Sequence, residues 1–154
     1  MIELAHPHLF TPVQIGPITL KHRVVMAPLT RSRSEQPGDI PGALMLEYYA
    51  QRASDGGFIV SEGTSVSLTG RGWVGAPGLY SGQQVEGWKK ITAAIHAKSG
   101  YMFSQLWHTG RSSRVEMAGG QDQAVTASGP RYCGNPDDHR GLSQSRGAGK
   151  GCGL

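Results

Sequence analysis

The stretch FIVSEGT at residues 58–64 decides the fold class, because its character changes halfway along. Its first three residues form a continuously apolar run, which is typical of a strand buried on both faces of a parallel sheet. The Gly56-Gly57 pair ends the preceding element, and the polar residues 61–64 follow the apolar run directly. The stretch therefore predicts a buried strand whose carboxyl end carries polar side chains.

The same pattern occurs twice more along the chain. Residues 24–29 read VVMAPL and residues 101–107 read YMFSQLW. Pro28 has no backbone N–H to donate to a sheet, so it marks the end of the first of these strands. The three strands start near residues 24, 58 and 102, a spacing that fits the ~31 residues of a βα unit in an eight-stranded barrel with loop insertions.

Helical patterns fill the two intervals between these strands. Residues 43–54 place Met45, Tyr48, Tyr49 and Ala53 on one face. Ser81 with Gln84 three residues later is a capping box, which predicts a second helix that runs to about residue 99. Its inward-facing residues are expected to be Val85, Trp88, Ile91 and Ile95.

The chain begins with two short apolar segments around a Gly16-Pro17 turn, within residues 9–20, which predict a hairpin. The order is then hairpin, β, α, β, α, β. This order predicts an α/β protein, built as a partial (β/α)8 TIM barrel from the hairpin and about three βα units. A doubly wound sheet fits the pattern nearly as well. In both architectures ligands gather at the carboxyl edge of the strands, where Thr30, Glu62, Gly63, Gln105 and Trp107 are expected.

Composition excludes several other classes of protein. The 154 residues carry a net charge of +4 without a concentrated basic block, so we expect no nucleic-acid partner. The two cysteines lie far apart without a C-x-x-C motif, which argues against a disulfide scaffold or a cysteine-rich zinc site. No apolar run approaches the ~20 residues of a membrane helix, and the amino terminus lacks a signal-peptide pattern. We therefore expect a cytoplasmic protein.

Three positions at the strand ends could carry chemistry, and each has a purely structural alternative. Thr30 could hydrogen-bond a bound ring, or simply cap a turn. Gln105, among apolar neighbours, could pair with the edge of a heterocycle or with backbone. Trp107 and His108 could stack on a flat ligand, or belong to the core. His6 and His8 lack further ligands, so no metal site is predicted.

Four motifs taken together resemble the old yellow enzyme family of flavin oxidoreductases, including its 12-oxophytodienoate reductase-like branch. They are MAPLTR (26–31), EYYAQRA (47–53), SEGT (61–64) and QLWHTGR (105–111), and the opening LFTPVQIGPITLKHRVV is similar as well. The resemblance implies an eight-stranded barrel with a capping amino-terminal hairpin. It also implies bound FMN, NAD(P)H as hydride donor, and reduction of the C=C bond of an α,β-unsaturated carbonyl compound (an enone).

The resemblance also implies residue roles. The backbone around Pro28 and Leu29 is expected along the isoalloxazine, with the Thr30 hydroxyl on flavin O4 and Gly63 close beneath the ring. Gln105 is expected at the pyrimidine edge, and Trp107 on the substrate side. No catalytic residue is assigned, because the family's substrate-anchoring pair and proton-donating tyrosine come from later strands.

The resemblance divides the chain into two parts. Residues 9–130 are expected to form the amino-terminal part of an FMN-binding barrel. The Gly-rich residues 131–154 depart from the family pattern and are expected to be disordered or out-of-frame sequence. A chain truncated in this way is expected to be inactive by itself. The alternatives are a non-catalytic flavoprotein fragment with weak or no FMN binding, and an unrelated α/β binding domain.

Overall fold

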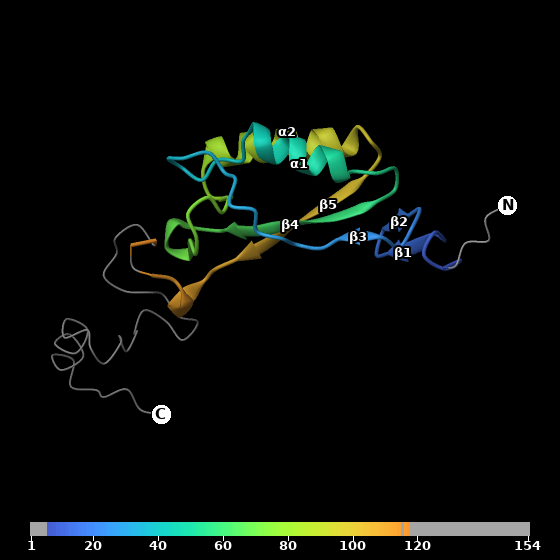
Figure 1. The fold of residues 1–154 in the computed structure, drawn as a ribbon, viewed down its shortest axis with the longest axis horizontal. Helices are drawn as coiled ribbons and strands as arrows, with labels where there is room; N and C mark the ends of the chain where they lie inside the picture. Colours follow the sequence, from blue (N-terminus) through green and yellow to red (C-terminus); the bar gives the residue numbers. More distant parts are fainter. Residues whose placement is uncertain (1–5, 115, 118–154) are drawn as a thin grey trace, which may run out of the picture.

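The central element is a three-stranded parallel sheet in the order β3-β4-β5, seen in a computed structural model that describes residues 6–114, 116 and 117 (Figure 1). Its strands are β3 (Val25–Met26), β4 (Phe58–Ser65) and β5 (Tyr101–Trp107). The register pairs Met26 with Ile59 and Ile59 with Met102. Spatial order equals chain order, so the described strands contain no reversal of the kind that defines a doubly wound sheet.

The predicted hairpin is present as β1 (Val13–Ile15) and β2 (Ile18–Leu20), which pair antiparallel around Gly16. It lies at the amino ends of the parallel strands (Figure 1). The Lys21 N–H just after it donates to the Gly56 carbonyl at 3.1 Å, which ties the hairpin to the turn before β4. The hairpin is therefore at the end of the sheet opposite the candidate site.

Both predicted helices form, and both cover the same face of the sheet (Figure 1). They are α1 (Ala43–Arg52) and α2 (Gly82–His96), and short 3-10 turns occur at Leu68–Gly70 and Gly110–Ser112. The capping box at the start of α2 is confirmed, with Ser81 accepting from the Gln84 N–H and the Gln84 side chain accepting from the Ser81 N–H. Successive βα units with helices on one side are the repeating pattern of a barrel wall.

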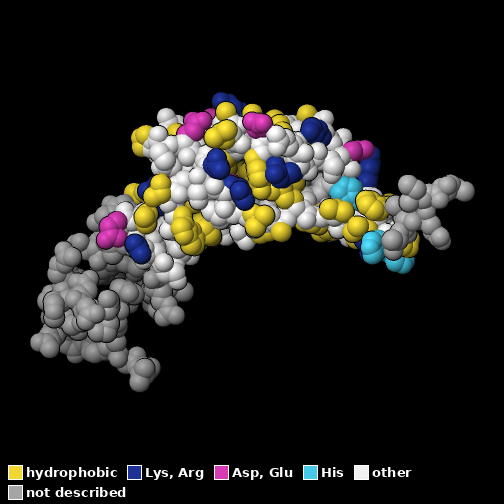
Figure 2. Space-filling view, in the orientation of Figure 1, with side chains coloured by type: hydrophobic (Ala, Val, Ile, Leu, Met, Phe, Trp, Pro, Cys, Tyr) yellow, Lys and Arg dark blue, Asp and Glu magenta, His cyan; other side chains and the backbone are white. Residues whose placement is uncertain are grey.

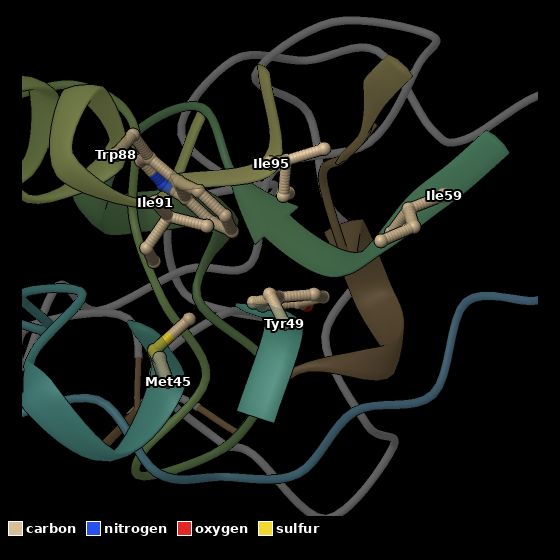
Figure 3. Packing of buried hydrophobic residues seen from close by; sticks show 6 residues of the cluster. All are labelled: Met45, Tyr49, Ile59, Trp88, Ile91 and Ile95. Atoms are coloured by element: carbon tan, nitrogen blue, oxygen red, sulfur yellow. The ribbon is translucent and has the colours of Figure 1, made fainter. Parts of the chain in front are cut away.

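The hydrophobic core lies between these helices and the sheet (Figure 3). It consists of Met45, Tyr49, Ile59, Trp88, Ile91 and Ile95. The inward orientation predicted for Val85 is wrong, because this side chain is 37% exposed. Gln84 is buried instead, and its amide donates to the Gly38 carbonyl at 2.8 Å while accepting from the Tyr80 N–H at 2.8 Å. At this end of α2, hydrogen bonds from a buried amide to two loop segments outweigh the burial of an apolar side chain.

On the face of the sheet opposite the helices, β3 and β5 are uncovered in the described part of the chain. The predicted burial of residues 24–29 on both faces is therefore wrong. Alternation along the strands turns Met26, Ile59 and Met102 toward the helices and Val25 and Phe103 away from them. Phe103 is 54% exposed. Figure 2 shows hydrophobic side chains at the surface along the sheet below the helices. The outer edges of β3 and β5 have no strand partner among the described residues.

A buried polar cluster joins α1, β4 and the loop that follows β3. The Tyr49 hydroxyl donates to Glu62 Oε1 at 3.2 Å and accepts from the Glu62 N–H at 2.8 Å. Glu62 Oε2 accepts from the Arg31 N–H at 2.9 Å. Burial raises the pKa of the Glu62 carboxyl, although these hydrogen bonds oppose the rise. The pKa of Tyr49 is also raised, first by burial and then by the nearby Glu62 charge.

Residues 131–154, with their predicted disorder or frame shift, lie outside the described residues. Within the described ranges, every helix is too short or too polar to span a bilayer. The same ranges contain no group of three or more side chains suited to holding a metal ion.

Two glycines of α2 provide a matched test of the packing. A Cβ at Gly87 would overlap the Pro41 carbonyl oxygen, whereas a Cβ at Gly82 would meet nothing within 4 Å. We expect Gly87→Ala to lower the free energy of unfolding by about 1–3 kcal/mol. Gly82→Ala should leave it unchanged or raise it by up to ~1 kcal/mol. Urea denaturation followed by far-UV circular dichroism measures both, and the reverse ranking would contradict this packing.

The raised pKa of Glu62 predicts a pH dependence of stability. At pH values between the ordinary pKa of 4.5 and the higher pKa of Glu62 in the folded protein, the folded state binds more protons than the unfolded chain. The stability contribution is therefore present below pH 4.5 and falls as the pH rises through the folded pKa. Glu62→Gln removes this titration. We expect the stability of the wild type minus that of Glu62→Gln to fall as the pH rises in urea titrations. A constant or rising difference would show that Glu62 is not held in this way.

Candidate functional site

The carboxyl edge of the sheet brings together the segments that carry the predicted site residues. Thr30 lies in the loop after β3, Gly63 near the end of β4, and Gln105 near the end of β5. Gly63 and Gln105 are register partners, directly after an irregularity between Val60 and Gly63. The short β3 ends at Met26, earlier than expected, so residues 27–30 have no regular secondary structure.

A hollow of about 200 Å³ opens at this edge and is lined by Thr30, Ser32, Trp73 and Trp107. Two residues singled out by sequence, Thr30 and Trp107, are therefore brought together here. The indole rings of Trp73 and Trp107 lie 5.0 Å apart between centroids, tilted by 30°. The walls combine flat apolar surface with hydroxyl groups, which is the kind of lining that a planar polar ring system requires.

The position of Trp107 depends on Gly63. The indole N–H donates to Ser65 Oγ at 3.1 Å, and a Cβ added at Gly63 would overlap the six-membered ring of the indole. Gly63 is therefore needed so that the aromatic side chain can lie against the backbone of β4. Its expected place beneath a flavin stays a prediction.

Gln105 differs from expectation in one respect, because its side chain is exposed rather than buried. Its backbone N–H donates to Ser61 Oγ at 3.0 Å, which fixes the strand at this position. The side-chain amide is solvated because it lies on the face of β5 that no described element covers. It shares a strand face with Phe103 and Trp107 by alternation, and its role at a heterocycle edge stays a prediction.

Two further expectations can be compared with the structure. Leu29 is 55% exposed and Pro28 is half-buried, so both are accessible along the segment that leads to Thr30. His108 has local partners: its Nδ1 accepts from the Gly110 N–H at 3.1 Å, and its Nε2 lies 3.5 Å from Thr69 Oγ1. For His108 these contacts favour a structural role in the turn after β5.

Sequence reasoning missed Trp73, Ser32 and the Tyr49–Glu62 pair. Trp73 and Ser32 lie in irregular loops, where no periodicity points to a face. A signal for the pair did exist, because a glutamate inside a strand that is otherwise buried requires a polar partner. The EYYAQRA motif supplies that partner from α1, but only the tertiary fold brings the two residues together.

The described residues fit the ring portion of a flavin. Thr30 supplies a hydroxyl, Trp107 and Trp73 supply flat apolar surface, and the exposed Gln105 amide offers two donors and an acceptor at the same sheet edge. These are the chemical groups that an isoalloxazine, with its apolar and pyrimidine-like ends, would need.

Comparisons with known proteins show the family to which the chain belongs. The profile of the NADH:flavin oxidoreductase / NADH oxidase family matches residues 8–146. The flavin oxidoreductase hxnT of Emericella nidulans is 48% identical over 116 residues, which are 73% of this chain and 30% of that protein. The 12-oxophytodienoate reductase 7 of rice (Oryza sativa subsp. japonica) is 50% identical over 105 residues, 68% of this chain and 26% of that protein.

Solved structures give the same result. The old yellow enzyme homologue from Zymomonas mobilis superposes with a TM-score of 0.69 at 49% identity, over 73% of this chain and 31% of that one. Morphinone reductase superposes with a TM-score of 0.71 at 48% identity, over 77% and 31%. The chain thus spans about a third or less of the length of these proteins. The described fold is part of a TIM barrel, and the chain belongs to the NADH:flavin oxidoreductase / NADH oxidase family, whose members include the old yellow enzymes.

Proposed function

We propose that this chain supplies the flavin-ring platform of an FMN-dependent NAD(P)H oxidoreductase of the ene-reductase type. The substrate class would be α,β-unsaturated carbonyl compounds, reduced at the C=C bond. The single observation that carries the proposal is the hollow at the carboxyl edge that Thr30 shares with Trp107, beside the Gly63–Gln105 register pair. Relatives named 12-oxophytodienoate reductase and a morphinone reductase solved with tetrahydroNAD support the substrate class and the nicotinamide donor.

Each residue of the platform has a task that its chemistry suits. The Thr30 hydroxyl would donate to flavin O4, and the Gln105 amide would meet the donors and acceptors of the pyrimidine edge. The backbone of Pro28 and Leu29 would lie along the ring, Gly63 beneath it, and Trp107 on the substrate side. FMN, when bound, supplies the hydride chemistry, while the protein supplies orientation and electrostatics.

Among the described residues, the lining of the hollow contains no side chain that could act as a general acid or base near neutral pH. The four side chains that line the hollow are hydroxyls and indoles, none of which is a general acid near neutral pH. A carbonyl anchor and a proton donor would have to come from elsewhere. The chain by itself is therefore proposed to orient a flavin without turning over an enone, which is also how a non-catalytic flavoprotein fragment would behave.

The Thr30 assignment predicts a loss of FMN affinity on removal of one hydroxyl. Thr30→Val keeps the side-chain volume and should weaken FMN binding about 3- to 10-fold, as expected for one neutral hydrogen bond of ~1 kcal/mol. The matched control is Thr19→Val, an exposed threonine on β2 in the hairpin. Titration of FMN fluorescence measures both variants. Equal affinities of Thr30→Val and the wild type would contradict the assignment.

The lack of acid–base groups among the described residues that line the hollow predicts negligible turnover. A positioned general acid contributes about 10²–10⁴ in rate, and an oxyanion donor about 10²–10³. We therefore expect the 154-residue chain with FMN, NADPH and 2-cyclohexenone to match a control of free FMN in an anaerobic assay. Turnover well above that control, and lost in Gln105→Ala, would show that the described residues build more of the site than proposed.

A further inference from the structure

We propose that Glu62 and Tyr49 are positioning residues for the flavin site. Their buried, hydrogen-bonded pair holds the backbone at Arg31 and thereby orients the Thr30 hydroxyl at the carboxyl edge of the sheet. The inference rests on the proposed function in one respect, the assignment of Thr30 to the flavin. Neither Glu62 nor Tyr49 lines the hollow itself, so both would act through the loop after β3.

The contact from Glu62 reaches the peptide group adjoining Thr30. Glu62 Oε2 accepts from the Arg31 N–H at 2.9 Å. This N–H belongs to the same planar unit as the Thr30 Cα and carbonyl, so anchoring it restricts the direction in which the Thr30 side chain can point. Glu62 is 1% exposed, and this burial shields the hydrogen bond from competing water.

Tyr49 fixes the carboxylate in turn. Its hydroxyl donates to Glu62 Oε1 and accepts from the Glu62 N–H, so the side chain and the backbone of the same residue are both held. Tyr49 is fully buried on α1, and its ring lies 6.0 Å from Trp88 in the core cluster. The orientation of the loop is thus connected through two side chains to the rigid core.

The loop needs such an anchor. Residues 27–34 have no regular secondary structure, and Ser32 has a φ of 53°, in the left-handed region that is unfavourable for a non-glycine residue. Thr30 and Arg31 are exposed. The Ser32 backbone also hydrogen-bonds the Glu62 carboxyl, and the next backbone anchor along the loop is the Ser34 N–H, which donates to the Gly75 carbonyl at 3.0 Å. The Glu62 carboxylate therefore holds the half of the loop that contains Thr30.

Burying a carboxyl group within a strand is energetically unfavourable. Burial disfavours its charged form, and an apolar side chain of similar size would often be at least as stable. The pair is therefore better explained by the geometry that it imposes on the loop than by stability alone.

Four variants separate positioning from packing. Glu62→Ala removes both acceptors. Glu62→Gln is the conservative variant, because its carbonyl can accept from the Arg31 N–H and its NH₂ can donate to the Tyr49 hydroxyl. Tyr49→Phe keeps the ring in the core and removes only the hydroxyl, which serves if Glu62→Ala does not fold. The control is Glu47→Ala on the exposed face of α1, where Glu47 accepts a hydrogen bond from the Gln51 side chain.

The measurements are amide hydrogen exchange of the peptide containing Arg31 and the dissociation constant of FMN, on the full 154-residue chain. We expect Glu62→Ala to speed exchange at Arg31 at least tenfold and to weaken FMN binding. Glu62→Gln should retain most of both properties, Tyr49→Phe should shift both in the direction of Glu62→Ala, and Glu47→Ala should change neither. The double variant Thr30→Val with Glu62→Ala should bind FMN no more weakly than Glu62→Ala, because the hydroxyl is already misplaced.

Losses of FMN affinity that add fully in the double variant would overturn the inference, since Glu62 would then act independently of Thr30. Unchanged exchange at Arg31 in a folded Glu62→Ala or Tyr49→Phe variant would overturn it as well. If the wild type itself binds no FMN, the proposed function fails. The positioning of the loop is then decided by exchange at Arg31 and its restoration in Glu62→Gln.

Discussion

The parallel pairing of β4 with strands on both of its edges is the constraint on which the described structure depends. β4 aligns β3 and β5 so that their carboxyl ends finish at one edge. On the helix side, Ile59 anchors the core shared by α1 and α2. Because this alignment is set by backbone hydrogen bonds, Thr30, Gly63 and Gln105 reach the same edge although they lie far apart in the chain.

The two halves of β4 differ in polarity. Its first half is apolar and packs against the helices, whereas residues 61–65 are polar and yet fully buried. Burial of these polar side chains is tolerated because each of them has a hydrogen-bond partner: Ser61 with Gln105, Glu62 with Tyr49 and Arg31, Thr64 with the Glu62 carbonyl, and Ser65 with Trp107. Through these hydrogen bonds, β4 connects the core to the segments that surround the hollow.

The uncovered face of the sheet explains why the site is open. Phe103 and Gln105 lie on a strand whose far edge is unpaired among the described residues. In the relatives of known structure this chain corresponds to about a third of the whole, and the matched part belongs to a closed barrel. That geometry leaves the hollow open on one side, which is where the proposed flavin ring would lie.

The sequence by itself determined the order of the elements, the hairpin, the capping box and the gathering of polar residues at the carboxyl edge, because periodicity, glycine pairs and strand-end polarity are local properties. It left a barrel and a doubly wound sheet open, since both share that local order. Only the tertiary structure decided that Gln84 rather than Val85 turns inward, that Trp73 meets Trp107, and that Tyr49 pairs with Glu62. Each of these is a contact between segments distant in the chain, and such contacts depend on how helices and loops pack rather than on the pattern of any one segment.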